Sequence, residues 1–190
     1  MNILISAVGG QGALLASRIL GKLAQNLGLD VKVSEVHGMS QRGGSVVTYV
    51  KFGDKVYSPI VEKGTADVIL AFEMLEGARY ADYLREGGTL IVSTQTIDPM
   101  PVITGAVQYP KELAEELSKL PIKLYNVDAI ELAGRAGNVR ATNVVLLGIL
   151  ASTSSISKEE WEKAISETVP AKMLEVNLKA FEVGYNYKGN

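Results

Sequence analysis

A glycine-rich turn joins an apolar strand to an amphipathic helix at the beginning of this sequence, and it limits the possible folds more than any other feature. Residues 2–8 are rich in β-branched residues and leucine, which is typical of a buried strand. Leucine, isoleucine and alanine recur at helical spacing over residues 13–27, which predicts a helix. The residues that lead from one to the other, 7–12, read Ala-Val-Gly-Gly-Gln-Gly. A strand that enters a helix through such a turn indicates an α/β sheet.

The segments that follow alternate between strands and helices. Further strands are expected at residues 31–36, 45–52, 67–72, 89–93 and 122–127, and helices at about 74–84 and 111–119. Two of these strands are apolar on both faces, as in parallel strands that helices cover on each side. Gly53-Asp54 indicates a tight turn, so residues 45–52 are expected to pair with residues 55–57 as an antiparallel hairpin. We therefore expect an α/β fold with a Rossmann-like, doubly wound, mostly parallel sheet and an antiparallel hairpin addition.

The last third of the chain is expected to be a helical segment. Residues 143–150 form an apolar helical run, and Ser157-Lys158-Glu159-Glu160 matches a capping box that opens a helix reaching Thr168. A last amphipathic helix is expected at about 172–183. The sequence shows no repeat and no linker, and 190 residues with 47% hydrophobic content suffice for one core. We expect a single domain over residues 1–190, with the C-terminal helices at about 138–184 packed on the sheet.

The residue types that are missing exclude several kinds of chemistry. The chain has no cysteine, and because thiolates hold iron–sulfur clusters, we expect no cluster in it. His37 is the only histidine, so a zinc site or a histidine-based nucleophile triad lacks its parts. The 19 basic and 21 acidic residues nearly cancel, which argues against a nucleic-acid partner. No apolar run is long enough to cross a membrane and no signal peptide is evident, so we expect a cytoplasmic chain.

The glycine-rich turn is suited to an anion, because the first N–H groups of the helix point at it and carry the positive end of the helix dipole. Compared with the dinucleotide fingerprint G-x-G-x-x-G, Gly9 and Gly12 take the second and third places and Ala7 takes the first. Glu35 lies about where a dinucleotide fold places its ribose-binding carboxylate, so NAD or FAD binding is one alternative. The other alternative is structural: the glycines let the helix pack closely on the strand.

Two more polar segments are candidate binding loops. Residues 37–44 follow the second strand, so they should emerge at the same sheet edge as the glycine-rich turn, and Arg42 is suited to phosphate or carboxylate. The alternative is a solvated surface loop, and for His37 a hydrogen-bonding role is favoured over catalysis. Residues 137–143 precede the apolar helix. There, Asn138 either acts as an N-cap while Arg140 is solvated, or both contact a ligand or a subunit.

These three segments resemble one protein family. Gly9-Gly10-Gln11-Gly12, residues 35–44 and residues 138–143 are similar, in order and spacing, to the signature segments of the indolepyruvate:ferredoxin oxidoreductase beta subunit. The resemblance runs from Met1 to about Gly184. The glycine-rich turn with Arg-Gly-Gly alone would indicate only the broader gamma domain of pyruvate and ketoisovalerate oxidoreductases. Ala7 departs from the family pattern, which usually has glycine there, and this bears on how tight the turn is.

The resemblance implies the non-cluster subunit of an enzyme that oxidatively decarboxylates arylpyruvates with coenzyme A, giving an aryl-acyl-CoA, carbon dioxide and reduced ferredoxin. It implies a larger alpha subunit that binds thiamine diphosphate with Mg²⁺ and carries [4Fe-4S] clusters, and a chain that is inactive alone and has no catalytic or metal-binding residue of its own. The missing cysteines agree with this, as does the absence of a Gly-Asp-Gly followed by a distant Asn-Asn that could hold the diphosphate. The residues then expected to contact a cofactor or co-substrate are Gly9, Gly10, Gln11, Gly12, Ser40, Gln41, Arg42, Gly43, Gly44, Asn138, Arg140 and Asn143.

Other interpretations stay open on the sequence. One is a gamma subunit of a pyruvate, ketoisovalerate or 2-oxoglutarate oxidoreductase, which differs in substrate and in subunit count. Another is a stand-alone NAD- or FAD-binding module without a link to 2-oxoacids. The sequence also leaves open whether the isolated chain forms a homodimer.

Overall fold

The computed structural model describes residues 1–38 and 43–189, and these build a six-stranded sheet in the order β2-β3-β1-β4-β5-β6. The strands are β1 (Asn2–Val8), β2 (Asp30–His37), β3 (Ser45–Gly53), β4 (Ala66–Ala71), β5 (Leu84–Ser93) and β6 (Lys123–Val127). β1, β4, β5 and β6 run parallel, whereas β3 is antiparallel to both of its neighbours, β1 and β2. The expected α/β fold, with a mostly parallel sheet and an antiparallel addition, is confirmed.

The hairpin, however, does not lie where the sequence placed it. β2 pairs along its whole length with β3, from Asp30 opposite Gly53 to His37 opposite Val46, and the expected pairing of 45–52 with 55–57 is wrong. An eight-residue partner strand offers many more backbone hydrogen bonds than three residues after a turn. Beyond Gly53 the chain leaves the sheet, and the Val56 N–H donates to the Asp30 carboxylate at 2.8 Å.

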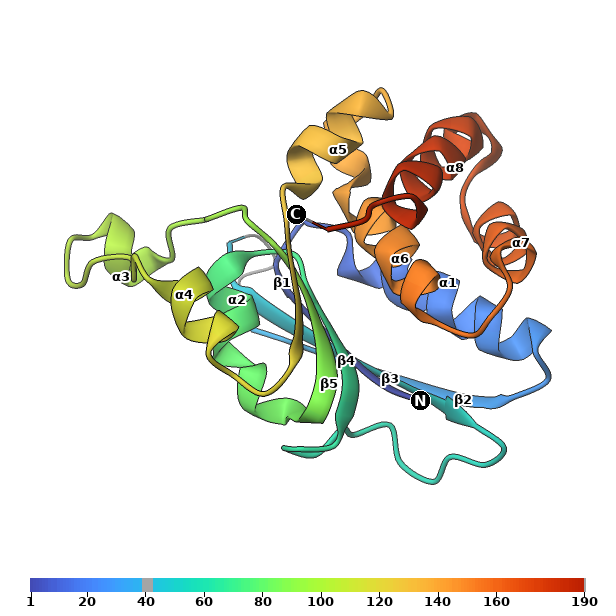
Figure 1. Ribbon diagram of the computed structural model, residues 1–190, viewed down its shortest axis with the longest axis horizontal. Helices are drawn as coiled ribbons and strands as arrows, with labels where there is room; N and C mark the ends of the chain where they lie inside the picture. Colours follow the sequence, from blue (N-terminus) through green and yellow to red (C-terminus); the bar gives the residue numbers. More distant parts are fainter. Residues whose placement is uncertain (39–42, 190) are drawn as a thin grey trace.

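Helices cover both faces of the sheet (Figure 1). One face carries α1 (Ala13–Asn26), α5 (Ala129–Arg135), α6 (Thr142–Thr153), α7 (Lys158–Thr168) and α8 (Ala171–Tyr185). The other face carries α2 (Met74–Arg79) and α4 (Leu113–Ser118), with the 3₁₀ turn η1 (Ala81–Tyr83) after α2. Alternate residues of β1 therefore enter different cores, Ile3 and Ile5 on the side of α1 and Leu4 on the side of α2. No helix in the described part of the chain has the length and apolar content to span a membrane.

The C-terminal helices begin and end close to the expected residues. Ser157 caps α7, because its hydroxyl accepts a hydrogen bond from the Glu160 N–H at 3.4 Å, as the capping box predicts. α6 is apolar on all sides and lies between α1, α5 and α8. The short helices α3 (Met100–Ile103) and α5, and the 3₁₀ turn η2 (Val139–Ala141), were not expected.

Candidate functional site

The glycine-rich turn lies at the carboxyl edge of the parallel strands, where β1 passes into α1. Gly10 and Gly12 have φ values of +101° and +88°, a region that other residues rarely adopt. The Leu15 and Ala16 N–H groups donate to the Gly12 carbonyl at 3.1 and 3.2 Å, so the helix begins directly after this glycine and no side chain caps it. The first N–H groups of α1 therefore have no partner within the helix and point at the sheet edge.

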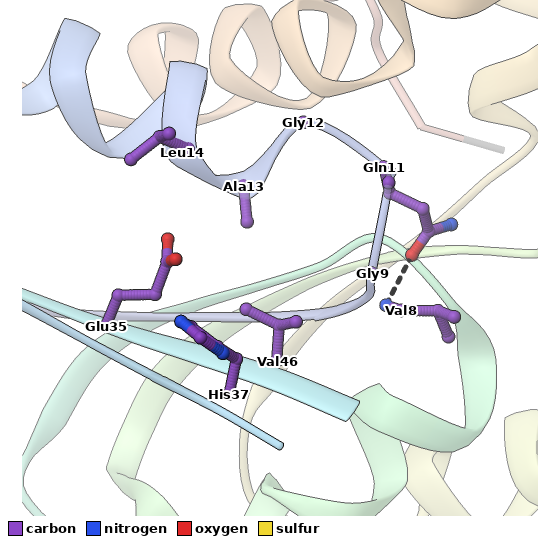
Figure 2. Close-up of a pocket in the computed structure, with 10 residues that line it drawn as sticks. Val8, Gly9, Gln11, Gly12, Ala13, Leu14, Glu35, His37 and Val46 are labelled. Carbon is purple, nitrogen blue, oxygen red and sulfur yellow. Dashed lines mark hydrogen bonds between the residues drawn. The ribbon is translucent and has the colours of Figure 1, made fainter. Parts of the chain in front are cut away.

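Gln11 holds this turn against the neighbouring strands. Its Oε1 accepts a hydrogen bond from the Val8 N–H at 2.7 Å, which Figure 2 shows as a dashed line. Its Nε2 donates to the Phe72 carbonyl at 2.9 Å and to Gln95 Oε1 at 3.0 Å. The amide of Gln11 is thus engaged inside the protein, and its contacts fix the turn relative to the ends of β4 and β5.

The second predicted segment reaches the same edge. The Gly9 N–H donates to the Gly44 carbonyl at 2.8 Å, which joins the end of this segment to the glycine-rich turn. The expectation that the two loops lie at one edge is confirmed by this contact. His37 is exposed, and its Nδ1 lies 3.1 Å from the Gly38 carbonyl. The predicted binding residues Ser40, Gln41 and Arg42 lie outside the described residues, while Gly43 adopts a φ of +77°.

The third predicted segment approaches the turn from the opposite side. Asn143 is buried, and its Nδ2 donates to the Gly12 carbonyl at 3.2 Å. The Asn138 side chain accepts from the Arg140 N–H at 2.9 Å and so caps η2. The alternative that Asn138 caps the apolar helix is wrong, because Ala141 is the N-cap of α6 and no side chain caps that helix. Arg140 is exposed beside Asn138. The structure thus brings the described parts of all three signature segments together around Gly9–Gly12.

Two open pockets flank the turn. The β2-side pocket has a volume of about 380 Å³ and is bounded by residues 8–14 together with Glu35, His37 and Val46. Figure 2 shows the Glu35 carboxylate directed toward the start of α1, with the His37 ring beside it. The α8-side pocket has a volume of about 220 Å³ and is bounded by residues 10–12 and by side chains of α8 that include Met173 and Asn177. From the third segment it is lined by Asn138, Arg140, Ala141 and Asn143.

The two pockets offer different chemical groups to a ligand. In the β2-side pocket the Glu35 carboxylate is exposed and accepts a long hydrogen bond of 3.5 Å from Thr48 Oγ1, so it can accept from a hydroxyl or an amine of a ligand. In the α8-side pocket Arg140 supplies a guanidinium, which can pair with phosphate or carboxylate. Among residues 1–38 and 43–189, no three or more histidine, aspartate or glutamate side chains gather as a metal site would need.

A buried carboxylate next to the site was not predicted from the sequence. Glu73 lies two residues after the end of β4, at the N-cap of α2, and is 1% exposed. One of its oxygens accepts from the Glu76 N–H at 2.8 Å, and the other accepts from the Tyr109 hydroxyl at 2.5 Å and from the Ile97 N–H at 3.1 Å. Burial, and then the hydrogen bond to Glu73, raise the pKa of the Tyr109 phenol above its usual range. The sequence signal was a glutamate directly after an apolar strand, at an edge where the chain must cap a new helix.

Known proteins that resemble this chain in sequence or in structure include subunits of related oxidoreductases. Residues 2–187 match the family described as pyruvate ferredoxin/flavodoxin oxidoreductase. The indolepyruvate oxidoreductase subunit IorB of Pyrococcus horikoshii is 46% identical over 190 residues, which cover 96% of this chain and 93% of that protein. The gamma subunit of a keto/oxoacid ferredoxin oxidoreductase from Geobacter sulfurreducens has a similar structure, with a TM-score of 0.72, 27% identity and coverage of 97% and 95%.

A longer relative shows the same region joined to further sequence. The ketoisovalerate oxidoreductase subunit VorA of Methanothermobacter marburgensis is 29% identical over 192 residues, which cover 98% of this chain but only 36% of that protein. In that relative the matched region is therefore one part of a polypeptide that is more than twice as long.

Proposed function

This chain belongs to the pyruvate ferredoxin/flavodoxin oxidoreductase family, and from that premise we propose that it is the smaller, non-cluster subunit of an indolepyruvate:ferredoxin oxidoreductase. In this role it assists the oxidative decarboxylation of arylpyruvates to aryl-acyl-CoA with reduction of ferredoxin. The observation that carries the proposal is the convergence of the signature segments at one sheet edge, through the contacts of Gly9 with Gly44 and of Gly12 with Asn143.

The partner subunit supplies the redox and carbanion chemistry in this proposal. The chain has no cysteine, so a [4Fe-4S] cluster held by thiolates must reside elsewhere in the complex. Thiamine diphosphate with Mg²⁺ stabilises the carbanion that decarboxylation leaves, and both belong to the large subunit. Thiolate-held clusters and free thiols persist in a reducing compartment, which favours a cytoplasmic complex.

In this proposal the chain helps to bind the substrates and closes the active site of the complex. The N-terminal N–H groups of α1 at the glycine-rich turn favour an anion, and Arg140 stands on the α8 side of the same turn. Both substrates carry anionic groups: coenzyme A has a diphosphate, and a 2-oxoacid has a carboxylate. We therefore assign the glycine-rich turn and Arg140 to the docking of coenzyme A or the 2-oxoacid at the face that meets the large subunit, and we assign the same role to Arg42 from its place in the sequence between Gly38 and Gly43.

An activity assay on the assembled enzyme tests this function. The chain is co-expressed with the large subunit of the same source, and reduction of a ferredoxin or a viologen dye is followed with indolepyruvate and coenzyme A. We expect reduction only when both substrates and both subunits are present. Full activity of the large subunit without this chain would contradict the proposal.

Substrate choice is the finer part of the proposal. The relative from Methanothermobacter marburgensis is named for ketoisovalerate, so a gamma subunit for pyruvate, ketoisovalerate or 2-oxoglutarate is the alternative within the enzyme class. The same assay with indolepyruvate and these three other 2-oxoacids separates the alternatives, since we expect the highest kcat/KM for indolepyruvate.

A stand-alone NAD- or FAD-binding module is disfavoured by the strand order. In a dinucleotide fold the second strand lies directly beside the first, whereas here β3 lies between β1 and β2. Glu35 is therefore one strand farther from the glycine-rich turn than a ribose-binding carboxylate would be. Titration of the isolated chain with NADH, FAD and coenzyme A should show no tight dinucleotide binding.

A further inference from the structure

A projecting segment between β5 and α4 carries apolar side chains that the chain itself does not cover. Residues 97–109, here called the apolar finger, include α3, which Figure 1 shows at the far end of the molecule, away from the sheet. Met100, Ile103 and Val107 are 64%, 65% and 55% exposed. More than half of the surface of each side chain is left uncovered by this chain, and exposed apolar groups that gather on one projection mark an interaction surface.

The composition of the finger is that of an interface core. Asp98 is its only charged residue, whereas loops in contact with water usually carry several polar and charged side chains. The central parts of protein interfaces are depleted in charge and enriched in residues such as methionine. The finger therefore fits an apolar groove of a protein partner, and it has little to offer a nucleic acid or a charged small molecule.

The base of the finger is held in place by one buried carboxylate. Ile97 at its first end and Tyr109 at its last end both donate to Glu73 Oε1, at 3.1 and 2.5 Å. The Leu75 N–H donates to the Tyr109 hydroxyl at 3.1 Å, which fixes the ring further. Within the finger, the Ala106 and Val107 N–H groups donate to the Pro101 carbonyl at 2.9 and 3.2 Å. A segment ordered in this way loses little conformational entropy when it binds.

The position of the finger favours a partner that also covers the glycine-rich turn. The Met74 N–H donates to the Gln95 carbonyl at 2.9 Å, and the Gln95 side chain accepts from Gln11 at 3.0 Å, so the finger starts from the same sheet edge as the glycine-rich turn. A subunit that covers the turn meets the finger as well. In the longer relative, the region that matches this chain is already joined to additional sequence in one polypeptide.

We propose that the apolar finger docks into an apolar groove of the large catalytic subunit and so fixes this chain over the active site. This inference rests on the proposed function, because it takes the large subunit as the partner. It adds that the apolar finger makes the contact and that the groove which receives it is apolar. A second copy of this chain is the competing occupant, and the experiment below distinguishes the two.

Lysine substitutions test the contact in the full-length chain. Ile103→Lys and Met100→Lys place a charge at the tip, and Ile60→Lys is the matched control, because Ile60 is 46% exposed on the loop at the opposite edge of the sheet. Affinity for the purified large subunit is measured by biolayer interferometry, and circular dichroism checks the fold of each variant. We expect each tip variant to weaken the affinity by about tenfold or more, since a buried unpaired charge is costly, while the control stays within about twofold of the wild type.

Site-specific photo-crosslinking identifies the occupant. p-Benzoylphenylalanine is placed at Ile103, and at Ile60 as the control, in the assembled complex. We expect a product with the summed mass of this chain and the large subunit from position 103 only. A product of two copies of this chain, or tip variants that bind as tightly as the wild type, would overturn the inference while the proposed function stands. A wild-type chain that forms no complex with the large subunit would overturn both.

Discussion

At the residue scale, the glycine-rich turn depends on Gly12 in two ways. Its φ of +88° is strained for any residue with a side chain, and a Cβ there would lie 2.6 Å from Asn143 Nδ2. We expect Gly12→Ala to lower the free energy of unfolding by about 2–4 kcal/mol, with about 1–2 kcal/mol from the backbone and the rest from displacement of Asn143. Urea unfolding followed by circular dichroism measures the change.

Gly28 provides the matched control for this substitution. Its φ is +72°, but a Cβ there would meet nothing within 4 Å. Gly28→Ala should therefore show only the backbone part, about 1–2 kcal/mol. Equal losses for the two variants would mean that the contact between Gly12 and Asn143 adds nothing to the stability of the turn.

Arg42 carries a prediction about binding. If the segment that contains it contacts coenzyme A or the 2-oxoacid, Arg42→Ala should raise the KM of the assembled enzyme for one of them by about tenfold, the usual scale for the loss of a charged hydrogen bond. Arg18→Ala on the exposed side of α1 is the control and should leave both KM values unchanged. Unchanged constants for both substrates in Arg42→Ala would exclude this role.

The Tyr109 hydroxyl gives the stability of the chain a dependence on alkaline pH. Its raised pKa means that its contribution is complete below the ordinary tyrosine pKa of about 10 and is lost as pH rises through the higher value of the folded state. We expect Tyr109→Phe to cost about 1–3 kcal/mol at pH 7, because Glu73 loses a donor while it is buried. The difference in stability between wild type and Tyr109→Phe should shrink above pH of about 10.

Tyr57 serves as the control for the pH measurement, since it is 83% exposed. Tyr57→Phe should leave the stability close to that of the wild type at pH 7 and over the whole alkaline range. If the difference in free energy of unfolding between wild type and Tyr109→Phe stays constant from pH 7 to about pH 11, the hydrogen bond from the Tyr109 phenol to Glu73 does not make the stability depend on alkaline pH.

Much of the candidate site was predictable from residues that stand together in the sequence. The glycines predicted the turn. Asn138 was expected to cap the apolar helix, but it caps the 3₁₀ turn η2 that precedes this helix. The role of Gln11 was not predictable, because its partners Phe72 and Gln95 are distant in the chain. Glu73 was missed for the same reason, since Tyr109 and Ile97 approach it only in the folded state.

At the element scale, two glycines let α6 and α8 pack at close range. A Cβ on Gly148 would overlap the Phe181 carbonyl and lie 2.8 Å from the Tyr185 nitrogen, and one on Gly184 would overlap the Val145 carbonyl. Backbone cannot yield as a flexible side chain can. We expect Gly148→Ala and Gly184→Ala each to lower the free energy of unfolding by about 1–3 kcal/mol, as measured by thermal and urea unfolding.

Gly134 in α5 is the control for this pair. A Cβ there would make an ordinary contact of 3.8 Å with Val139. Because alanine favours a helix more than glycine does, Gly134→Ala should be neutral or stabilising by up to about 1 kcal/mol. A loss in Gly134→Ala as large as that in Gly184→Ala would contradict close helix packing as the cause.

The strands were more predictable in position than in order. Periodicity and apolar runs located all six strands, because each strand carries its own pattern. The insertion of β3 between β1 and β2 was not visible, since the choice between pairing partners depends on the whole sheet. The turn signal at Gly53-Asp54 was local, and the longer pairing of β3 with β2 prevailed over it.

At the scale of the whole molecule, the sheet and the C-terminal helices share one core. Ile3 and Ile5 of β1, Leu146 and Ile149 of α6 and Phe181 of α8 belong to the same buried cluster. We propose that the chain is one folding unit, and we expect a single unfolding transition with coincident midpoints by tryptophan fluorescence of Trp161 and by circular dichroism. Loss of the Trp161 signal well before loss of the sheet signal would indicate two units.

We propose that this chain completes a catalytic partner at the edge marked by the glycine-rich turn. Titration of the purified chain into a fixed amount of the purified large subunit, with coenzyme A and indolepyruvate present, tests it most directly. We expect ferredoxin reduction to rise from near zero and to saturate at a fixed ratio of the two chains, and we expect Ile103→Lys to shift the titration to higher concentration. A rate that is already maximal without this chain, or one that does not respond to it, would show that the large subunit does not need this chain.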